Sequence, residues 1–289
     1  MSRKALTSGG GRPAAVLALC LSMALGTACG TAGTEGHAAQ RPQDAVRPEA
    51  ARTAPESRTP GTLPGSPPAR GSLAGKRIVL DPGHNGNNYR HPEIINRKVN
   101  VITERKACDT TGTQAPGGYT EAAFTWDVSR RLAEILRRQG ATVTLTRTSN
   151  TGVGPCITER AAIGNKAKAD AVLSIHADGS APRNQGFHVI VPKKINGPVD
   201  PVVAASARLG VDIRNAYAKG TGIPYSTYVG SEGIHARNDI GGLNLSTVPK
   251  VLLECGNMKN PKEAAKFADP KFRERIAVSL SRGLNTYLR

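Results

Sequence analysis

The sequence predicts an α/β fold, a single domain with a central, mostly parallel β-sheet that is flanked by helices on both faces. Two patterns support this prediction. Stretches typical of strands alternate with stretches typical of helices along residues 74–289, and several of the strands are uniformly apolar, as strands covered on both faces are. The sequence contains no internal repeat and no second folded module.

The predicted strands are short apolar or β-branched runs. The first covers residues 76–80 and leads into the turn Asp81-Pro82-Gly83. Further strands are predicted at residues 141–146, 171–175, 186–191 and 248–253.

Helices are predicted between these strands. The clearest one follows the N-cap candidate Thr120, ends near Gly140 and has one apolar face, formed at helical spacing by Phe124, Val128, Leu132 and Ile135. Further helices are predicted at 157–168, at 202–218 and in two stretches that close the chain. The last of these has an apolar face made of Phe272, Ile276, Leu280, Leu284 and Leu288.

The segment 85–118 is long and polar, with few indications of secondary structure. A loop of this length inside a compact domain is usually functional.

The N-terminal residues have the features of an export signal. Basic residues precede the apolar run 14–25, and small residues follow it, so we expect residues 1–29 to be a signal peptide. Cys29 comes directly after this run and can be lipidated, although Gly26 stands where such signals usually have Leu. Free secretion and lipid anchoring both stay open. Residues 30–73 are rich in Pro, Ala and Thr, which predicts a disordered linker before the folded domain 74–289.

The chain is strongly basic, with a formal net charge of +17. Residues 1–72 hold eight Lys/Arg and four Asp/Glu, so +13 of this charge belongs to the rest of the chain. A basic surface of this size suits a polyanionic neighbourhood. For an exported protein, anionic wall polymers or lipid head groups fit better than nucleic acid, for which no binding motif is present. We therefore expect no nucleic-acid partner.

Three cysteines belong to the folded part. Cys108 and Cys156 lie in polar, glycine-containing stretches, and a bridge between them is compatible with an oxidising compartment. Cys255 ends an apolar run and is expected to be a buried free thiol.

Residues able to bind a metal follow three of the predicted strands. His84 follows the first strand, His176 the strand 171–175, and Glu254 the strand 248–253. Glu121 adds a carboxylate on the apolar face of its helix, where an isolated charge is costly. Two histidines and one carboxylate form a common catalytic zinc set, and a further carboxylate can act on a water molecule. Each residue also has a structural explanation: a loop histidine, a helix N-terminal charge or an ion-pair partner.

Four stretches resemble a known family. LDPGHNG (80–86), YTEAAFTWDVSRRL (119–132), VLSIHADG (172–179) and VLLECGNMKN (251–260) are similar, in order and spacing, to the zinc-dependent N-acetylmuramoyl-L-alanine amidases of the amidase-3 type. The resemblance covers residues 75–289. It implies Zn²⁺ ligands at His84, Glu121 and His176, a catalytic glutamate at Glu254, and an α/β fold with a mostly parallel sheet.

The resemblance also implies an activity and a location. The reaction is hydrolysis of the amide bond between the muramic acid lactyl group and the L-alanine of the peptidoglycan stem peptide. We expect a monomer that acts outside the cytoplasm at the cell wall, with a Cys108–Cys156 disulfide pinning a flap formed by residues 85–118. The alternatives are another secreted zinc amidohydrolase or peptidase, and a catalytically inactive peptidoglycan-binding module.

Overall fold

The computed structural model describes residues 71–289. Its central feature is a six-stranded sheet in the order β4-β1-β5-β8-β6-β7. The strands are β1 (Arg77–Pro82), β4 (Thr142–Leu145), β5 (Ala171–Asp178), β6 (His188–Pro192), β7 (Ile234–Arg237) and β8 (Lys250–Asn257). Within this sheet only the β6–β8 pair is antiparallel, so the prediction of a mostly parallel sheet is confirmed.

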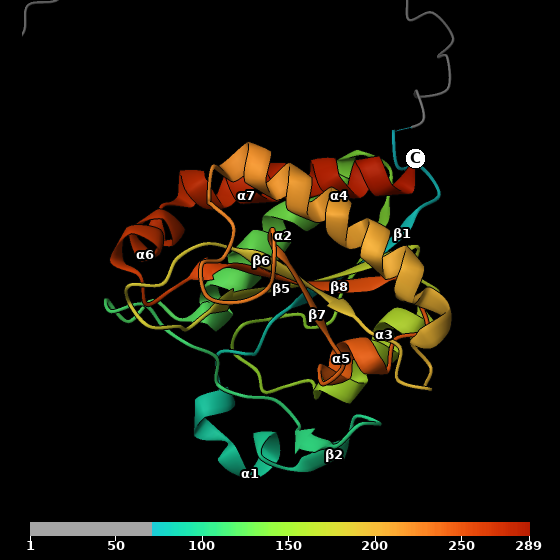
Figure 1. Cartoon of the computed structure of the whole chain (residues 1–289), viewed down its shortest axis with the longest axis horizontal. Helices are drawn as coiled ribbons and strands as arrows, with labels where there is room; N and C mark the ends of the chain where they lie inside the picture. The colour runs from blue at the N-terminus through green and yellow to red at the C-terminus, as the bar shows by residue number, and fades with distance from the viewer. Residues whose placement is uncertain (1–70) are drawn as a thin grey trace, which may run out of the picture. The chain divides into compact units, whose positions relative to one another are not determined.

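Helices cover both faces of this sheet. The larger helices α2 (Glu121–Arg138), α4 (Val203–Thr221) and α7 (Pro270–Leu288) pack on one face, with α6 (Pro261–Ala268) beside them. The shorter α3 (Ile157–Lys166) and α5 (Gly241–Asn244) lie on the other face, below the sheet in Figure 1. The main hydrophobic core therefore lies between the sheet and α2, α4 and α7.

Local sequence explains where α2 begins and ends. The Thr120 hydroxyl accepts a hydrogen bond from the backbone N–H of Ala123, which caps the helix as expected. Phe124, Val128 and Leu132 are fully buried against the sheet. The helix stops before Gly140, whose φ of +92° lies in the region that glycine adopts most easily.

Several short elements were not predicted from the sequence. The segment 85–118, expected to be a loop, contains the short helices η1 (Asn88–Arg90) and α1 (Pro92–Ile95) and a hairpin of β2 (Lys98–Asn100) and β3 (Arg105–Ala107). The hairpin strands have three residues each and carry charged side chains, so they lack the apolar alternation that indicates a strand. Strand β7, the four-residue α5 and the 3₁₀ turn η2 (Asp200–Val202) were also missed, because each is too short to show a periodic apolar pattern.

The predicted signal peptide, Cys29 and linker residues 30–70 lie outside the described residues. Leu73, at the end of the expected linker, is buried in the core of the described domain. Within residues 71–289, no helix combines the length and the apolarity needed to cross a bilayer.

The register of the strands separates apolar from polar side chains. Leu173, Ile175, Leu253 and Cys255 belong to the main core on the α2/α4/α7 side. The alternate residues include His176 and Glu254, which are paired in register. Because neighbours in register share a face, both point to the α3/α5 side. The prediction placed these two residues just beyond their strands. They lie inside β5 and β8, which end at Asp178 and Asn257, beyond the predicted runs 171–175 and 248–253.

Candidate metal centre

His84, Glu121 and His176 meet at the carboxyl ends of β1 and β5. Their ligand atoms all lie within 4.8 Å of one another. Oε1 of Glu121 lies 3.2 Å from Nε2 of His84 and 3.0 Å from Nδ1 of His176. The structure thus brings together the three residues that were expected to share a metal. Two imidazoles and one carboxylate, from three distant parts of the chain, form a donor set that suits Zn²⁺.

His84 is held by contacts on the other side of its ring. Its Nδ1 lies 3.2 Å from Oδ1 of Asp109 and 3.1 Å from the carbonyl oxygen of Thr110. Both partners accept hydrogen bonds, so Nδ1 stays protonated, and Nε2 is the ring nitrogen on which a metal would take the place of a proton. Burial lowers the pKa of His84, but the carboxylates of Glu121 and Asp109 outweigh it and raise that pKa to about 10.

The backbone of His84 adopts a φ of +57°, which is unusual for a residue other than glycine. Two buried arginines fix this turn. Arg160 donates to the carbonyl oxygens of Pro82 and His84 at 2.7 and 2.9 Å. Arg147 donates to the carbonyl of Pro82 at 3.1 Å. These bonds satisfy the carbonyls of the turn and offset the cost of its conformation.

Arg160 also joins two buried carboxylates. It contacts Oδ1 of Asp81 at 3.0 Å and Oδ2 of Asp109 at 3.1 Å. Asp81 in turn contacts Nζ of Lys250 at 3.0 Å and accepts a hydrogen bond from Ser174. Burial raises the pKa of Asp81, but Lys250 and Arg160 outweigh it and hold that pKa well below its usual range. A chain of charges thus runs from the sheet to the imidazole of His84.

Glu121 is the first residue of α2 and points into the centre, as its place on the apolar face of the helix predicted. Its Oε2 accepts a hydrogen bond from the backbone N–H of Thr113 at 2.9 Å. Two glycines make room for the three ligands. A Cβ on Gly83 would lie 2.4 Å from the ring of His176, and one on Gly112 would lie 2.7 Å from His84.

Glu254 lies beside His176 on the neighbouring strand. It lines the same hollow as the three ligand residues, together with Ile190, Arg237 and Leu252; we call this the central hollow. Its Oε2 is buried and has no hydrogen-bond partner among the described residues. Burial raises the pKa of Glu254 well above its usual range, and the negative charges of Glu121 and Asp178 add to this. A carboxyl group in this state can exchange a proton with a molecule bound in the hollow.

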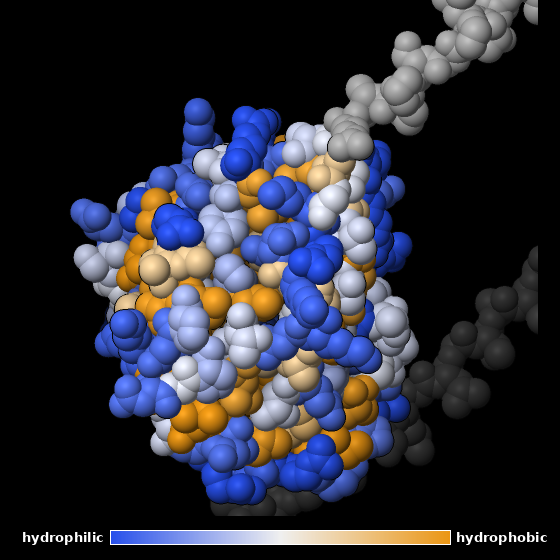
Figure 2. All heavy atoms as spheres, turned by 90° about the vertical axis from the view of Figure 1, so that its right-hand side faces the viewer, coloured by the Kyte–Doolittle hydropathy of each residue, from blue (hydrophilic) through white to orange (hydrophobic). Residues whose placement is uncertain are grey.

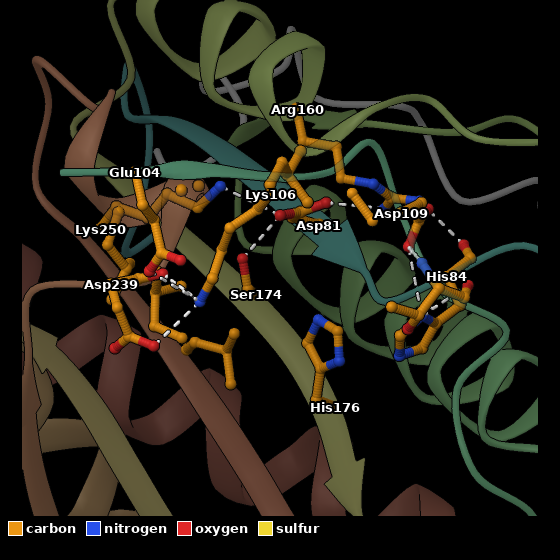
Figure 3. Close-up of a pocket in the computed structure, with 18 of the residues that line it drawn as sticks. Asp81, His84, Glu104, Lys106, Asp109, Arg160, Ser174, His176, Asp239 and Lys250 are labelled. Carbon is orange, nitrogen blue, oxygen red and sulfur yellow. Dashed lines mark hydrogen bonds and ion pairs between the residues drawn. The ribbon is translucent and has the colours of Figure 1, made fainter. Parts of the chain in front are cut away.

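A cavity of about 440 Å³ adjoins the central hollow beneath the β2–β3 hairpin. In Figure 3, His84 and His176 stand at one end of it, and the ion pair of Lys106 with Asp239 stands at the other. We call it the hairpin cavity. Segment 85–118 therefore forms one wall of the site, which agrees with the functional role expected for it.

Cys108 and Cys156 form a disulfide in the described structure. Cys108 precedes Asp109, and Cys156 is the N-cap of α3, the helix that carries Arg160. The bridge therefore ties the two partners of the Asp109–Arg160 ion pair together. Cys255 is free and buried, as expected.

Sequence reasoning missed Asp81, Asp109, Arg160 and Lys250. Asp81 was interpreted as a turn residue and Asp109 as part of a polar loop. Lys250 carried a detectable indication, because a lysine inside the apolar run 248–253 requires a buried anion.

Comparison with known proteins agrees with this geometry. Residues 78–286 match the model of the family Amidase_3, described as N-acetylmuramoyl-L-alanine amidase. The chain is 36% identical over 220 residues to N-acetylmuramoyl-L-alanine amidase Rv3717 of Mycobacterium tuberculosis, a match covering 75% of this chain and 88% of that protein.

Two crystal structures of amidases named Ami1 are similar as well, each at 38% identity over 75% of this chain. The one from Mycobacterium smegmatis has a TM-score of 0.70 and is covered over 98% of its length. The one from Mycobacterium abscessus has a TM-score of 0.69 and is covered completely, at 100%. The extent of the family match and the identity to these relatives lead to one conclusion: the chain belongs to the N-acetylmuramoyl-L-alanine amidase family.

Proposed function

We propose that this protein is a zinc-dependent N-acetylmuramoyl-L-alanine amidase, which hydrolyses the amide bond between the lactyl group of muramic acid and the L-alanine of the stem peptide. The observation that carries the proposal is the convergence of His84, Glu121 and His176 within 4.8 Å beside a buried carboxyl group. A catalytic zinc site uses three such protein ligands and leaves a position for substrate or water.

When bound, Zn²⁺ would polarise the scissile carbonyl and acidify a water molecule. Nε2 of His84, Nδ1 of His176 and Oε1 of Glu121 are the donor atoms nearest one another and would hold the ion. Asp109 and Thr110 keep His84 in the tautomer that this role requires.

Glu254 is proposed to be the general base and acid. Its carboxylate takes a proton from the attacking water, and its carboxyl group then delivers that proton to the leaving nitrogen of L-alanine. The raised pKa of Glu254 supports the second step, because burial favours the protonated carboxyl form that donates the proton. The apolar side chains of Ile190 and Leu252 in the central hollow limit the access of bulk water to this carboxyl group.

The place of action is proposed to be outside the cytoplasm, at the cell wall. Export would depend on residues 1–29, and the net charge of +13 on the folded part suits anionic wall polymers or lipid head groups. Figure 2 shows a face on which hydrophilic side chains predominate and hydrophobic ones form separate patches. Mass spectrometry of the exported protein would distinguish lipidation of Cys29 from free release.

The test is a product assay on purified peptidoglycan. The amidase should release stem peptides with a free L-alanine amino group and leave glycan strands intact. Release of peptides with a different N-terminus would favour another zinc peptidase. Binding of peptidoglycan without release, by protein that holds no zinc, would favour an inactive binding module.

A further inference from the structure

A second hollow adjoins the metal centre and shares no residue with the hairpin cavity. It measures about 670 Å³ and includes Asn85, Tyr89, Gln114 and Lys259 in its walls. Gly112 and Thr113 belong both to this hollow and to the central hollow that contains Glu254. We call it the Tyr89 groove. The two hollows therefore meet at these two residues, beside the candidate ligands His84 and Glu121.

We propose that the Tyr89 groove binds the glycan strand of the substrate, as neutral N-acetylated sugars next to the muramic acid whose bond is cut. This inference rests on the proposed function and adds the orientation of the substrate in the site. The sugars lie in the Tyr89 groove, and the stem peptide lies toward the hairpin cavity.

The side chains that line the Tyr89 groove and the hairpin cavity differ as this orientation of the substrate requires. Apart from Lys259, the polar side chains in the Tyr89 groove are neutral amides and hydroxyls. The Gln114 side chain is exposed and, like the Thr113 hydroxyl, makes no hydrogen bond within residues 71–289. Sugar hydroxyl and acetamide groups are natural partners for such donors and acceptors. The hairpin cavity instead has Lys98, Lys106 and Asp239 in its walls, which suit the ionised groups of a peptide.

Tyr89 is the feature that points most directly to a sugar. Its side chain is 61% exposed, the largest exposed fraction among the large hydrophobic residues of the described chain. The apolar face of a pyranose ring stacks on an aromatic ring of this kind, while the phenol oxygen stays in water. Such a ring is a binding platform when its position is fixed.

One contact restrains this ring, and a second set fixes the η1 turn that carries it. Nε of Arg90 donates a hydrogen bond to the Tyr89 hydroxyl at 2.6 Å. The neighbouring Asn88 is fully buried, donates to the carbonyl of Thr110 at 2.8 Å and accepts from the N–H of Gly154 at 2.9 Å. The same Thr110 carbonyl accepts the Nδ1 proton of His84. The η1 turn that presents Tyr89 is thereby anchored to the residue that positions a metal ligand.

The kinetic test compares substrates with short and long glycans. A muramyl peptide with one sugar reaches only the metal centre, whereas strands of four or more sugars reach the groove. Tyr89→Ala should raise KM for the long strands about five- to tenfold, without changing kcat and without affecting the single-sugar substrate. Tyr89→Phe keeps the stacking ring but loses the hydrogen bond from Arg90, so its KM for the long strands should lie between those of the wild type and Tyr89→Ala. Gln114→Ala, an exposed polar change, should raise KM for the long strands in the same direction.

A matched control is Tyr225→Ala. Tyr225 is 40% exposed and does not line the central hollow, the hairpin cavity or the Tyr89 groove, so its loss should leave both substrates unaffected. A binding measurement adds a readout free of catalysis. Chitotetraose, an uncharged sugar oligomer, should bind Glu254→Gln protein, and adding Tyr89→Ala should weaken this binding about five- to tenfold.

The outcomes separate the two proposals. If the wild type cleaves neither substrate, the proposed activity is wrong. If the wild type cleaves both substrates, and Tyr89→Ala and Gln114→Ala have the same KM as the wild type for the long strands, the glycan assignment is wrong. Equal loss on the single-sugar substrate would also overturn the assignment, because it would place Tyr89 in the support of the metal centre.

Discussion

Nδ1 of His84 lies 3.2 Å from Oδ1 of Asp109, and the opposite ring nitrogen lies 3.2 Å from Oε1 of Glu121. The imidazole is thus held on one edge by a carboxylate that is not a candidate ligand, so that the other edge faces the candidate metal position. Partners of this kind fix the tautomer and the ring orientation of a metal-binding histidine.

This relationship predicts the effect of Asp109→Ala. Without the carboxylate, the His84 ring loses its main anchor and Arg160 loses one of its two buried anions. We expect zinc affinity to fall by about 10- to 100-fold, as is usual when such a partner is removed. Competition with a chromophoric chelator measures it.

Asp170→Ala provides the control for this change. Asp170 pairs with Arg77 at the opposite end of β5 from His176 and is partly exposed. Zinc affinity should be unchanged in that variant. Wild-type affinity in Asp109→Ala would show that the contact does not position His84.

The second prediction separates the roles of Glu254 and the three ligand residues. Glu254→Gln keeps the shape of the side chain but cannot take a proton. We expect kcat to fall at least about 10²-fold, the usual contribution of a general base. Zinc content should stay at the wild-type level, measured by metal analysis of the purified protein.

His84→Ala and His176→Ala should behave in the opposite way, since each removes a donor atom. Their zinc content should fall together with activity. Loss of zinc from Glu254→Gln would make Glu254 a ligand, and full zinc stoichiometry in either histidine variant would remove that histidine from the donor set.

The third prediction concerns the buried charge of Asp81. Asp81→Asn leaves Lys250, which is 1% exposed, without its anion and removes one anion from Arg160. Breaking a buried ion pair from one side typically costs about 3–5 kcal/mol. Urea unfolding at pH 7 measures the difference.

Asp127→Asn is the control, because Asp127 is half-buried and its ion pairs with Arg131 and Arg273 lie near the surface, where a pair contributes about 1 kcal/mol or less.

The effect of Asp81→Asn on stability should also depend on pH. The pKa of Asp81 is lowered in the folded protein, so its contribution is fully present above the unfolded value of 3.8 and is lost as the pH falls toward the folded value. The difference in unfolding free energy between the wild type and Asp81→Asn should therefore be constant near neutral pH and shrink below about pH 4. A difference that grows on acidification would contradict the charged state of Asp81.

Much of the fold could be predicted because its strands and helices carry strong patterns. The apolar run 171–175 and the face of Phe124, Val128 and Leu132 are examples, since burial itself requires such residues. The elements that were missed follow other rules. The hairpin strands and β7 are short and charged, and the reversed direction of β6 leaves no trace in its sequence.

The residues of the candidate site likewise fall into those that the sequence could predict and those that it could not. His84, His176 and Glu254 could be located because strands of known direction bring their carboxyl ends together. The surrounding charges could not, because their pairing depends on side-chain directions between distant segments. Arg160 and Asp109 are 51 residues apart, and Lys250 and Asp81 are 169 apart. No local pattern indicates which of several acids each base will contact.

The last prediction joins the disulfide to the metal centre. The bridge closes a loop of 48 residues, for which the loss of chain entropy in the unfolded state corresponds to about 4 kcal/mol. Removal of a native disulfide typically costs about 2–5 kcal/mol, so we expect Cys108→Ser/Cys156→Ser to lose an amount in this range in urea unfolding. Zinc affinity should fall as well, because the bridge holds Asp109 next to the helix that carries Arg160. A phosphine reductant should reproduce both changes in the wild type and have no further effect on the double variant, which keeps no disulfide within residues 71–289, where Cys255 is the remaining cysteine. If stability falls while zinc affinity does not, the bridge stabilises the loop alone, and the Asp109–Arg160 contact positions His84 without it.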